Sequence, residues 1–437
     1  MVSFRTLYLV IACLLLEQAP RFEVFSFQAA GLFLLATATI FLTLCMVVGV
    51  YTIRAKAARA SFPNQLESLG QCRRRFETLW TLLYPILLVA IGWHAWAFAF
   101  ETERAVSINS VVMLFGPHVL VMLALEVLMA AMVADVSEAD PTQSDFSKLS
   151  WATAFQMGIR QGGLLSLAMC LTPMLFILAA QNSYVSLSAV MPWEVTAILV
   201  AVSAFAMLLL FPQCVGWFLG ARTLDDASLR VRTEQLLHVS GGKRLSVRLL
   251  DGPGWATAAV VGFLPWGQQL WLGQALIDQL SDEELDLVVL HEVAHVRKWH
   301  FAYRLLPAAW ALGLSVLFVW ATDDLWTEAG IAGADSALVV LASVIVFLVG
   351  LIVVSRACEL EADREACELA RSFCPWSAGK VGEPNARLAT ALCNLLGRDA
   401  RSARGSWLHP SLEDRLRNLA EDLNQQKRRI ARNVAAS

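Results

Sequence analysis

Charged residues are scarce in this chain. Asp, Glu, Lys and Arg together make up 16% of its 437 residues, whereas hydrophobic residues make up 57%. Soluble globular domains contain about 25% charged and about 45–50% apolar residues. The composition therefore excludes an ordinary soluble enzyme, and it indicates that most of the chain lies in a membrane.

Further absences narrow the class of protein. The nine cysteines form no Cys-x-x-Cys pair, so the sequence predicts no disulfide framework, and reduced, buried thiols are expected. The net charge of -3 gives no excess of basic residues, so we expect no nucleic-acid partner. Internal repeats and low-complexity tracts are not evident. The remaining expected partner at this point is a lipid bilayer.

Long apolar runs are abundant. Seven of them contain few or no charges and are long enough to cross the hydrocarbon core of a bilayer, and Glu126 lies inside the third. Near the N-terminus, the run from Leu7 to Leu16 is too short to span comfortably, and no clear cleavage site follows. We therefore expect residues 1–26 to be an uncleaved interfacial or partly inserted segment. The seven predicted spans are 27–53, 78–100, 111–134, 161–181, 195–219, 303–322 and 336–355.

Loop charges predict the orientation of these spans. The loop after the first span and the stretch after the fifth are rich in Lys and Arg, which places both in the cytoplasm. Alternation then places the acidic connection 323–335 outside and returns the Arg-rich C-terminal part to the cytoplasm. The loop 135–160 is acidic although it is predicted to be cytoplasmic, but acidic residues weigh little in this rule.

His291, Glu292 and His295 form a His-Glu-x-x-His motif. Ser281 and Glu284 are a predicted capping box, and apolar residues follow them at helical spacing. The two histidines therefore lie one turn apart on one helix face, where both rings can bind one zinc ion with Glu292 beside them. The motif also occurs by chance on ordinary half-exposed helices, so a third ligand is needed to identify a zinc site.

Glu359 and Asp363 are the candidates that complete the site. They lie four residues apart in a strongly helix-forming segment that begins at Arg356, so they share one face. Glu359 is the predicted third zinc ligand, and Asp363 is expected to accept a hydrogen bond from the outer ring nitrogen of a ligand histidine. The alternative is a solvated acidic helix, which this segment taken alone would favour.

His300 competes with Glu359 for the third ligand position. It follows His295 by five residues, and five residues on a regular helix turn its side chain about 140° away. This is a poor geometry for a shared metal ion. We interpret His300 as an interfacial residue where the helix meets the membrane.

Two other polar segments surround the motif. Leu245, Val247 and Leu249 alternate with polar residues, and segments 256–264 and 268–272 flank a turn, so a strand and a hairpin are predicted. Such strands can present an edge to an extended peptide, or they can be packing without a substrate role. Near the C-terminus, His409 and the N-cap residue Ser411 precede a helix with an apolar stripe; such a lone histidine is more often structural than catalytic.

Together these motifs resemble the integral-membrane gluzincin peptidases of the CAAX prenyl protease and HtpX type. The likeness covers about residues 240–420 and consists of the His-Glu-x-x-His motif, a transmembrane hairpin, the Glu359 segment and His409-Pro410-Ser411 with Arg415. It implies that one zinc ion is bound by two histidines and a glutamate, with an aspartate behind them and a histidine and an arginine lining the site. The implied residues are His291, His295 and Glu359 for the metal, Asp363 behind them, and His409 and Arg415 at the active site.

The chain also departs from this family. Its members usually have an asparagine and an alanine in the strand before the catalytic helix, whereas this chain has Gly252-Pro253-Gly254-Trp255-Ala256. One contact with the substrate backbone is therefore in doubt. The first 220 residues contain no motif of their own, so a CAAX substrate does not follow from the resemblance.

We therefore predict a predominantly α, multispanning helical membrane protein of about seven spans, with a small α+β zinc peptidase domain of gluzincin type. Its predicted activity is that of a membrane-embedded zinc metalloendopeptidase on membrane-associated or unfolded polypeptides, with Glu292 as general base. Zinc, with His409 or Arg415, would stabilise the oxyanion. The predicted divisions are 1–26, a five-span membrane domain 27–221, catalytic halves 222–302 and 356–437, and a transmembrane hairpin 303–355 between those halves.

Two alternatives remain open. One is a sensor-transducer membrane metallopeptidase, which shares the metal-binding motifs but needs a long soluble segment outside the membrane; none is predicted here. The other is a non-catalytic membrane scaffold or transporter, in which Glu126, His94 and His118 would mark a polar path inside the spans.

Overall fold

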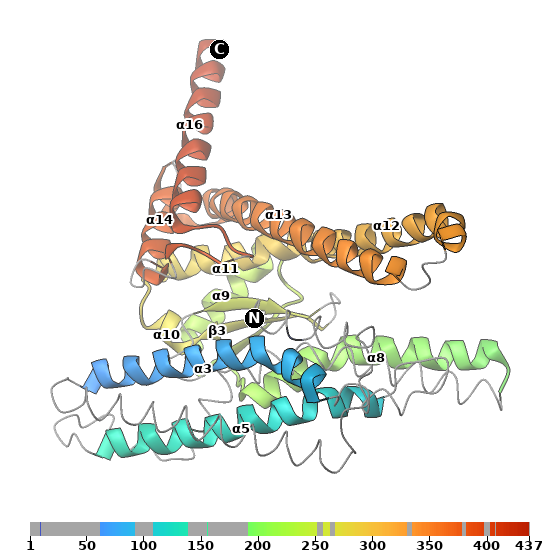
Figure 1. Ribbon diagram of the computed structural model, residues 1–437. Helices are drawn as coiled ribbons and strands as arrows, with labels where there is room; N and C mark the ends of the chain where they lie inside the picture. The colour runs from blue at the N-terminus through green and yellow to red at the C-terminus, as the bar shows by residue number, and fades with distance from the viewer. Residues whose placement is uncertain are drawn as a thin grey trace. The chain divides into compact units, whose positions relative to one another are not determined.

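A computed structural model describes most of the second half of the chain and parts of the first half (Figure 1). The chain divides into two compact units, Met1–Phe205 and Ala206–Ser437, and each is considered by itself. The described residues are 62–91, 108–138, 191–250, 257–262, 267–329, 334–377, 382–396, 403–406 and 408–436, with single positions 9 and 155.

In the first unit, helices α3 (Phe62–Ile91) and α5 (Ile108–Glu138) pack against each other. Their contact contains a buried ion pair, in which Arg73 of α3 donates to the fully buried carboxylate of Glu126 on α5. Glu77 also accepts from Arg73, at 3.0 Å. A buried charge is costly unless it is paired, so Arg73 explains how an apolar helix accommodates Glu126.

The described helices overlap five of the seven predicted spans. These helices are α3, α5, α8 (Trp193–Leu219), α12 (His300–Ala329) and α13 (Ala334–Phe373). The predicted spans 27–53 and 161–181, and the N-terminal segment 1–26 apart from Leu9, lie outside the described residues. Among the residues that the structure describes, one segment, Leu114–Met132 of α5, is long and apolar enough to cross a membrane. The mostly helical fold is confirmed, whereas the number of spans stays a prediction.

The second unit contains a small three-stranded sheet, as the alternation of apolar residues predicted. Its strands are β1 (Ser246–Leu250), β2 (Ala258–Val261) and β3 (Gln269–Gly273), in the order β1-β3-β2. β2 and β3 pair antiparallel, which confirms the predicted hairpin, while β1 pairs parallel to β3. Within the described residues β2 therefore forms one edge of the sheet.

Helix α11 (Asp282–Arg297) follows the sheet after the short helix α10 (Gln274–Ile277) and contains the His-Glu-x-x-His motif. The predicted capping box is present: Ser281 accepts from the Glu284 amide, and the Glu284 carboxylate accepts from the Ser281 amide at 2.8 Å. Its apolar face is fully buried in a core shared with β3, with α9 (Ala227–Ser240) and with α13. A well-started helix with a buried face gives the motif a fixed position.

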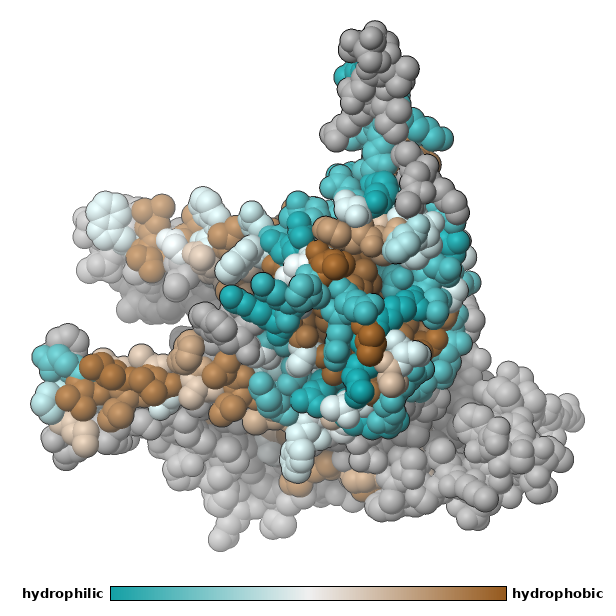
Figure 2. All heavy atoms as spheres, turned by 180° about the vertical axis from the view of Figure 1, so that it is seen from behind, coloured by the Kyte–Doolittle hydropathy of each residue, from teal (hydrophilic) through white to brown (hydrophobic). Residues whose placement is uncertain are grey.

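Helices α12 and α13 form an antiparallel hairpin that projects from the rest of the second unit (Figure 1). α13 is one unbroken helix of 40 residues. The expectation that the ligand helix begins at Arg356 was therefore wrong: the predicted seventh span continues into it without a break. The hairpin exposes large apolar side chains, including Trp310, Val316 and Trp320, which are 66%, 63% and 79% exposed. Figure 2 shows brown, hydrophobic side chains on the surface of the second unit.

The chain ends with helices α14 (Glu383–Leu396) and α16 (Leu412–Ala436), after a 3-10 turn at Pro375–Ser377. Ser411 accepts from the Asp414 amide at 3.1 Å, so Ser411 caps α16 as predicted. α16 packs against α13 and α14 through its first half. Leu419 is fully buried there, so at this position the predicted apolar stripe belongs to the core.

Candidate metal centre

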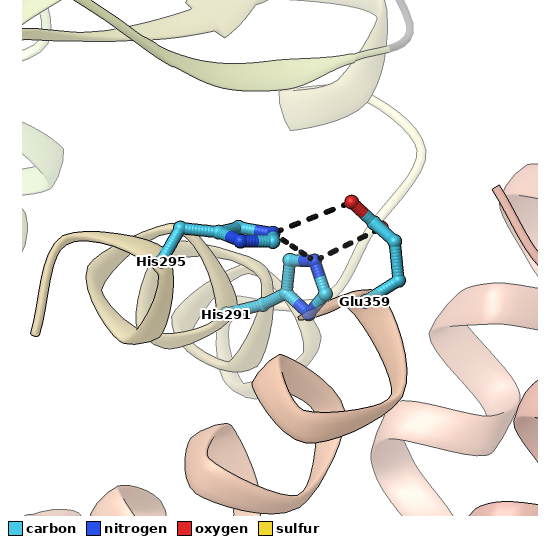
Figure 3. A group of neighbouring side chains, drawn as sticks. All are labelled: His291, His295 and Glu359. Atoms are coloured by element: carbon cyan, nitrogen blue, oxygen red, sulfur yellow. Dashed lines mark hydrogen bonds and ion pairs between the residues drawn. The ribbon is translucent and has the colours of Figure 1, made fainter. Parts of the chain in front are cut away.

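Two helices bring His291, His295 and Glu359 together. α11 presents both histidines on one face, and α13 presents the glutamate opposite them (Figure 3). Glu359 Oε2 lies 3.6 Å from His291 Nε2, and Glu359 Oε1 lies 3.5 Å from His295 Nε2. The two Nε2 atoms are 3.2 Å apart. The three predicted ligands therefore converge, although Glu359 follows His295 by 64 residues in the sequence.

The spacing of these atoms fits one tetrahedral metal ion. With bonds of about 2.0–2.1 Å to nitrogen and oxygen, the corners of a tetrahedron lie about 3.3–3.4 Å apart. The three separations of 3.2, 3.5 and 3.6 Å bracket that value. Two imidazoles and one carboxylate are also a ligand set that zinc commonly takes in catalytic sites, with a fourth position left open. The residues therefore fit the metal that the sequence implies.

Asp363 contacts the ring of His291 on the side away from the candidate metal position. Its Oδ1 atom lies 3.0 Å from His291 Nδ1, the ring nitrogen that points away from the other ligands. Burial by itself would lower the pKa of His291, but the carboxylates of Asp363 and Glu359 outweigh it and raise that pKa to about 9. Asp363 therefore occupies the position predicted for it, one shell behind the ligands.

Arg415 is the partner of Asp363. Its Nε atom donates to Asp363 Oδ2 at 2.8 Å, and its Nη2 atom donates to Oδ1, so the pair is bidentate. Both side chains are buried. Burial would raise the pKa of Asp363, but the Arg415 guanidinium holds it below the usual range. Sequence reasoning placed Arg415 at the reacting groups, whereas its described contacts are with the carboxylate behind His291.

Glu359 is surrounded by cationic or polar nitrogen atoms. Arg304 Nη2 donates to its Oε1 at 2.9 Å, and His409 Nδ1 lies 3.2 Å from its Oε2. Burial would raise the pKa of Glu359, but hydrogen bonds from His291 and His409 hold it well below the usual range. A carboxylate that stays ionised in a buried site is suited to bind a divalent cation.

Gly405 shapes the loop that positions His409. The loop folds back on itself, and a Cβ atom at Gly405 would lie 2.6 Å from Pro410 O and 2.7 Å from His409 O. Gly405 also has a φ of +76°, which most side chains disfavour. Ser406 Oγ then accepts from the His409 amide at 3.1 Å. The histidine predicted from the resemblance is thereby brought next to Glu359.

Glu292 lies beside the candidate ligands on α11, partly buried. Its Oε2 atom accepts from the backbone amide of Val260 on β2 at 3.0 Å, so the sheet edge fixes the carboxylate. Burial raises the pKa of Glu292. A general base works best when its pKa is raised towards the working pH, so this environment suits the predicted role.

Two residues near the ligands were misjudged or missed in the sequence. His300 is fully buried and its Nδ1 atom lies 2.8 Å from His295 Nδ1, so its interpretation as an interfacial residue was wrong. Arg304 was not singled out, although it is a lone charge at the start of an otherwise apolar run. A charge in an apolar run, one helical turn after His300, could have identified Arg304 from the sequence.

Comparisons with known proteins bear on the same residues. The sequence model of peptidase family M48 matches residues 224–422, a range that includes every residue of the candidate metal centre. The chain is also similar to the crystal structure of S. mikatae Ste24p, with 14% identity, a TM-score of 0.44, and coverage of 94% of this chain and 98% of that chain. A search of curated proteins found no match. Residues 224–422 of this chain therefore match the peptidases of family M48.

Proposed function

We propose that this protein is a membrane-embedded zinc metalloendopeptidase. The observation that carries the proposal is the convergence of His291, His295 and Glu359 beside Glu292, at separations that fit one tetrahedral zinc ion. When bound there, zinc supplies a Lewis acid and lowers the pKa of a water molecule towards neutrality.

The residues around the metal position have separate roles in this proposal. Glu292 takes the proton of the attacking water and passes it to the leaving amine, and the Val260 amide keeps its carboxylate in place. His409 stands beside Glu359 and is 29% exposed, so it can donate to the oxyanion of a bound substrate. Arg415 acts through Asp363 as a positioning residue, because both donors described above go to that carboxylate.

The edge strand β2 is the proposed substrate platform. It pairs with β3 on one side, and the Val260 amide that binds Glu292 belongs to the same strand. An extended peptide that adds to such an edge gains main-chain hydrogen bonds. It would then run past the candidate metal centre, with a scissile carbonyl close to Glu292. This arrangement favours unfolded or extended polypeptides over folded proteins.

The exposed apolar surface of the α12–α13 hairpin supports a place in the membrane. Monomeric soluble proteins rarely expose large apolar surfaces. Among the described side chains, α12 exposes Trp310, Val316 and Trp320, and α13 exposes Ile345, Val349 and Val353. We propose that the chain has about seven spans with the divisions predicted above, and that its catalytic domain faces the cytoplasm because the flanking loops are basic. Cysteines introduced at Thr327 and Ser402 test this orientation: only the first should react with an impermeant reagent added from outside.

The enzymatic proposal is tested with protein purified into lipid. We expect hydrolysis of an unfolded peptide to require zinc, to stop on chelation and to return when zinc is restored. A peptide with a membrane anchor should be cleaved faster than the same peptide without one at equal bulk concentration, since the anchor concentrates it at the bilayer. Equal rates would place the active site away from the membrane, and no zinc-dependent hydrolysis of either peptide would contradict the proposed function.

A further inference from the structure

The two candidate ligand histidines have different partners behind them. His291 has the carboxylate of Asp363 at its Nδ1 atom, 3.0 Å away. His295 has a second histidine there: His300 Nδ1 lies 2.8 Å from His295 Nδ1, and the rings meet edge to face at 4.9 Å. His300 is 0% exposed. A buried polar ring needs a hydrogen-bond partner, and His295 is the nearest one that His300 has.

The tautomers of both rings follow from the metal position. His295 Nε2 faces Glu359 and His291, so it must be unprotonated in order to bind a metal ion. The proton of a neutral His295 is then on Nδ1, which donates to His300 Nδ1. His300 Nδ1 accepts, so its own proton is on Nε2, and Glu361 Oε2 lies 3.5 Å from that atom. The contact with Glu361 is long, and Glu361 is half exposed, so the shorter contact between the two rings is the stronger interaction of His300.

A break between α11 and α12 brings His300 into this position. On a continuous helix His300 would point about 140° away from His295. Instead, α11 ends at Arg297 and Trp299 adopts a φ of 54°, the one non-glycine residue with positive φ among the described residues. Such a conformation costs about 1–2 kcal/mol for a side chain other than glycine. α12 then starts at His300 in a new direction, which returns its ring to His295.

We propose that His300 is a positioning residue, which holds the His295 ring in the tautomer and orientation that metal binding needs. This inference depends on the proposed zinc site. Partners behind ligand histidines typically change metal affinity by about 10–100-fold when they are removed. The backbone conformation at Trp299 is consistent with the role, because strained residues persist where the surrounding structure holds a functional geometry.

Three substitutions separate this role from simple packing. In His300→Asn, the side-chain oxygen can replace the accepting Nδ1 atom, which lies at the same distance from the backbone. In His300→Leu, size is roughly kept but the acceptor is lost. In His300→Gln, the amide lies one bond farther out, near the position of Nε2. His238, an exposed histidine on α9, provides the control His238→Leu.

Zinc affinity is measured by chelator competition on the full chain, and the ligand field by the visible spectrum of the cobalt-substituted protein. We expect His300→Leu to weaken zinc binding by about 10–100-fold and to change the cobalt spectrum. His300→Asn should stay within a few-fold of wild type, His300→Gln should fall between, and His238→Leu should be unchanged. If His300→Leu does not fold, the contrast between the Asn and Gln variants decides.

Wild-type affinity and an unchanged cobalt spectrum in both His300→Leu and His300→Gln would overturn the inference and leave the zinc site intact. Equal losses in His300→Asn and His300→Leu would also overturn it, because packing rather than the acceptor would then matter. A wild-type protein that binds no zinc would instead contradict the proposed function itself.

Discussion

The two halves of α13 differ in the side chains that they expose and bury. In residues 334–355 the aliphatic Val349 and Val353 are 55% and 62% exposed, whereas later in the same helix Glu359 and Asp363 are 4% and 0% exposed. Proteins in water ordinarily do the reverse. The difference supports the proposal that the first half of α13 lies in the membrane, whereas its second half builds a site in which each carboxylate has cationic or polar partners.

The continuity of α13 connects these environments closely. Glu359 follows Val353 by six positions, which is about 9 Å along a helix that rises 1.5 Å per residue. No linker lies between them, so the candidate metal centre stands next to the apolar surface of the hairpin. This proximity is the physical reason for expecting membrane-associated substrates.

Breaking the buried charge pair should have the largest effect on stability. Arg415→Leu leaves Asp363 without its bidentate partner, and breaking a buried pair costs about 3–5 kcal/mol. Arg417→Leu is the control on the same helix, because its pair with Glu413 is exposed and worth about 0–1 kcal/mol. Unfolding by denaturant in detergent compares them. Similar losses of unfolding free energy in both variants would contradict the expectation that the buried pair stabilises the fold more than the exposed one.

A charged residue introduced into the first half of α13 tests whether that half lies in the membrane. Val349→Glu should destabilise the membrane-inserted protein by about 2.5–3.5 kcal/mol if α13 passes through the bilayer centre there. Ala357→Glu places the same residue at an exposed position of the second half, where we expect a change within about 0.5 kcal/mol. Retention in alkali-washed membranes and unfolding in lipid report the effects. A Val349→Glu protein as stable as Ala357→Glu would show that the first half faces water.

Glu292→Gln on α11 tests the chemistry of the site that the second half of α13 helps to build. Loss of the general base should lower peptide hydrolysis by at least about a hundredfold, equivalent to about 2.7 kcal/mol, while zinc stays bound. Glu283→Gln on the same helix is the matched control and should keep full activity, since Glu283 pairs with Arg387 away from the ligands. Steady-state hydrolysis with zinc analysis of the same samples measures both. Unchanged turnover in Glu292→Gln would remove this residue from the mechanism.

Local signals in the sequence were sufficient to predict the positions of most residues in the candidate site. The capping box at Ser281 fixed the start of α11, and helical spacing placed His291 with His295 and Glu359 with Asp363. These positions agree with the structure because they depend on contacts within one or two turns of helix. The hairpin of β2 and β3 was predicted for the same reason, from a turn between two short apolar segments.

Contacts across the fold were not predictable in this way. The pairing of Arg415 with Asp363 joins α16 to α13, and no spacing in the sequence signals it. His300 was judged on a regular helix, but the helix breaks at Trp299, a residue type that rarely adopts positive φ. The start of α13 was misplaced because the composition changes at Arg356 while the helix continues. The change from apolar to charged residues at Arg356 therefore did not mark the end of one helix and the start of another.

Zinc content per chain is the measurement that tests the central claim most directly. Elemental analysis of purified protein should give about one zinc per chain in wild type and in Glu368→Ala, an exposed control on α13. Glu359→Ala should lose most of its zinc, because two histidines alone bind it weakly, while Glu292→Gln should keep it. A wild-type protein without zinc, or a Glu359→Ala variant with full occupancy, would contradict the account.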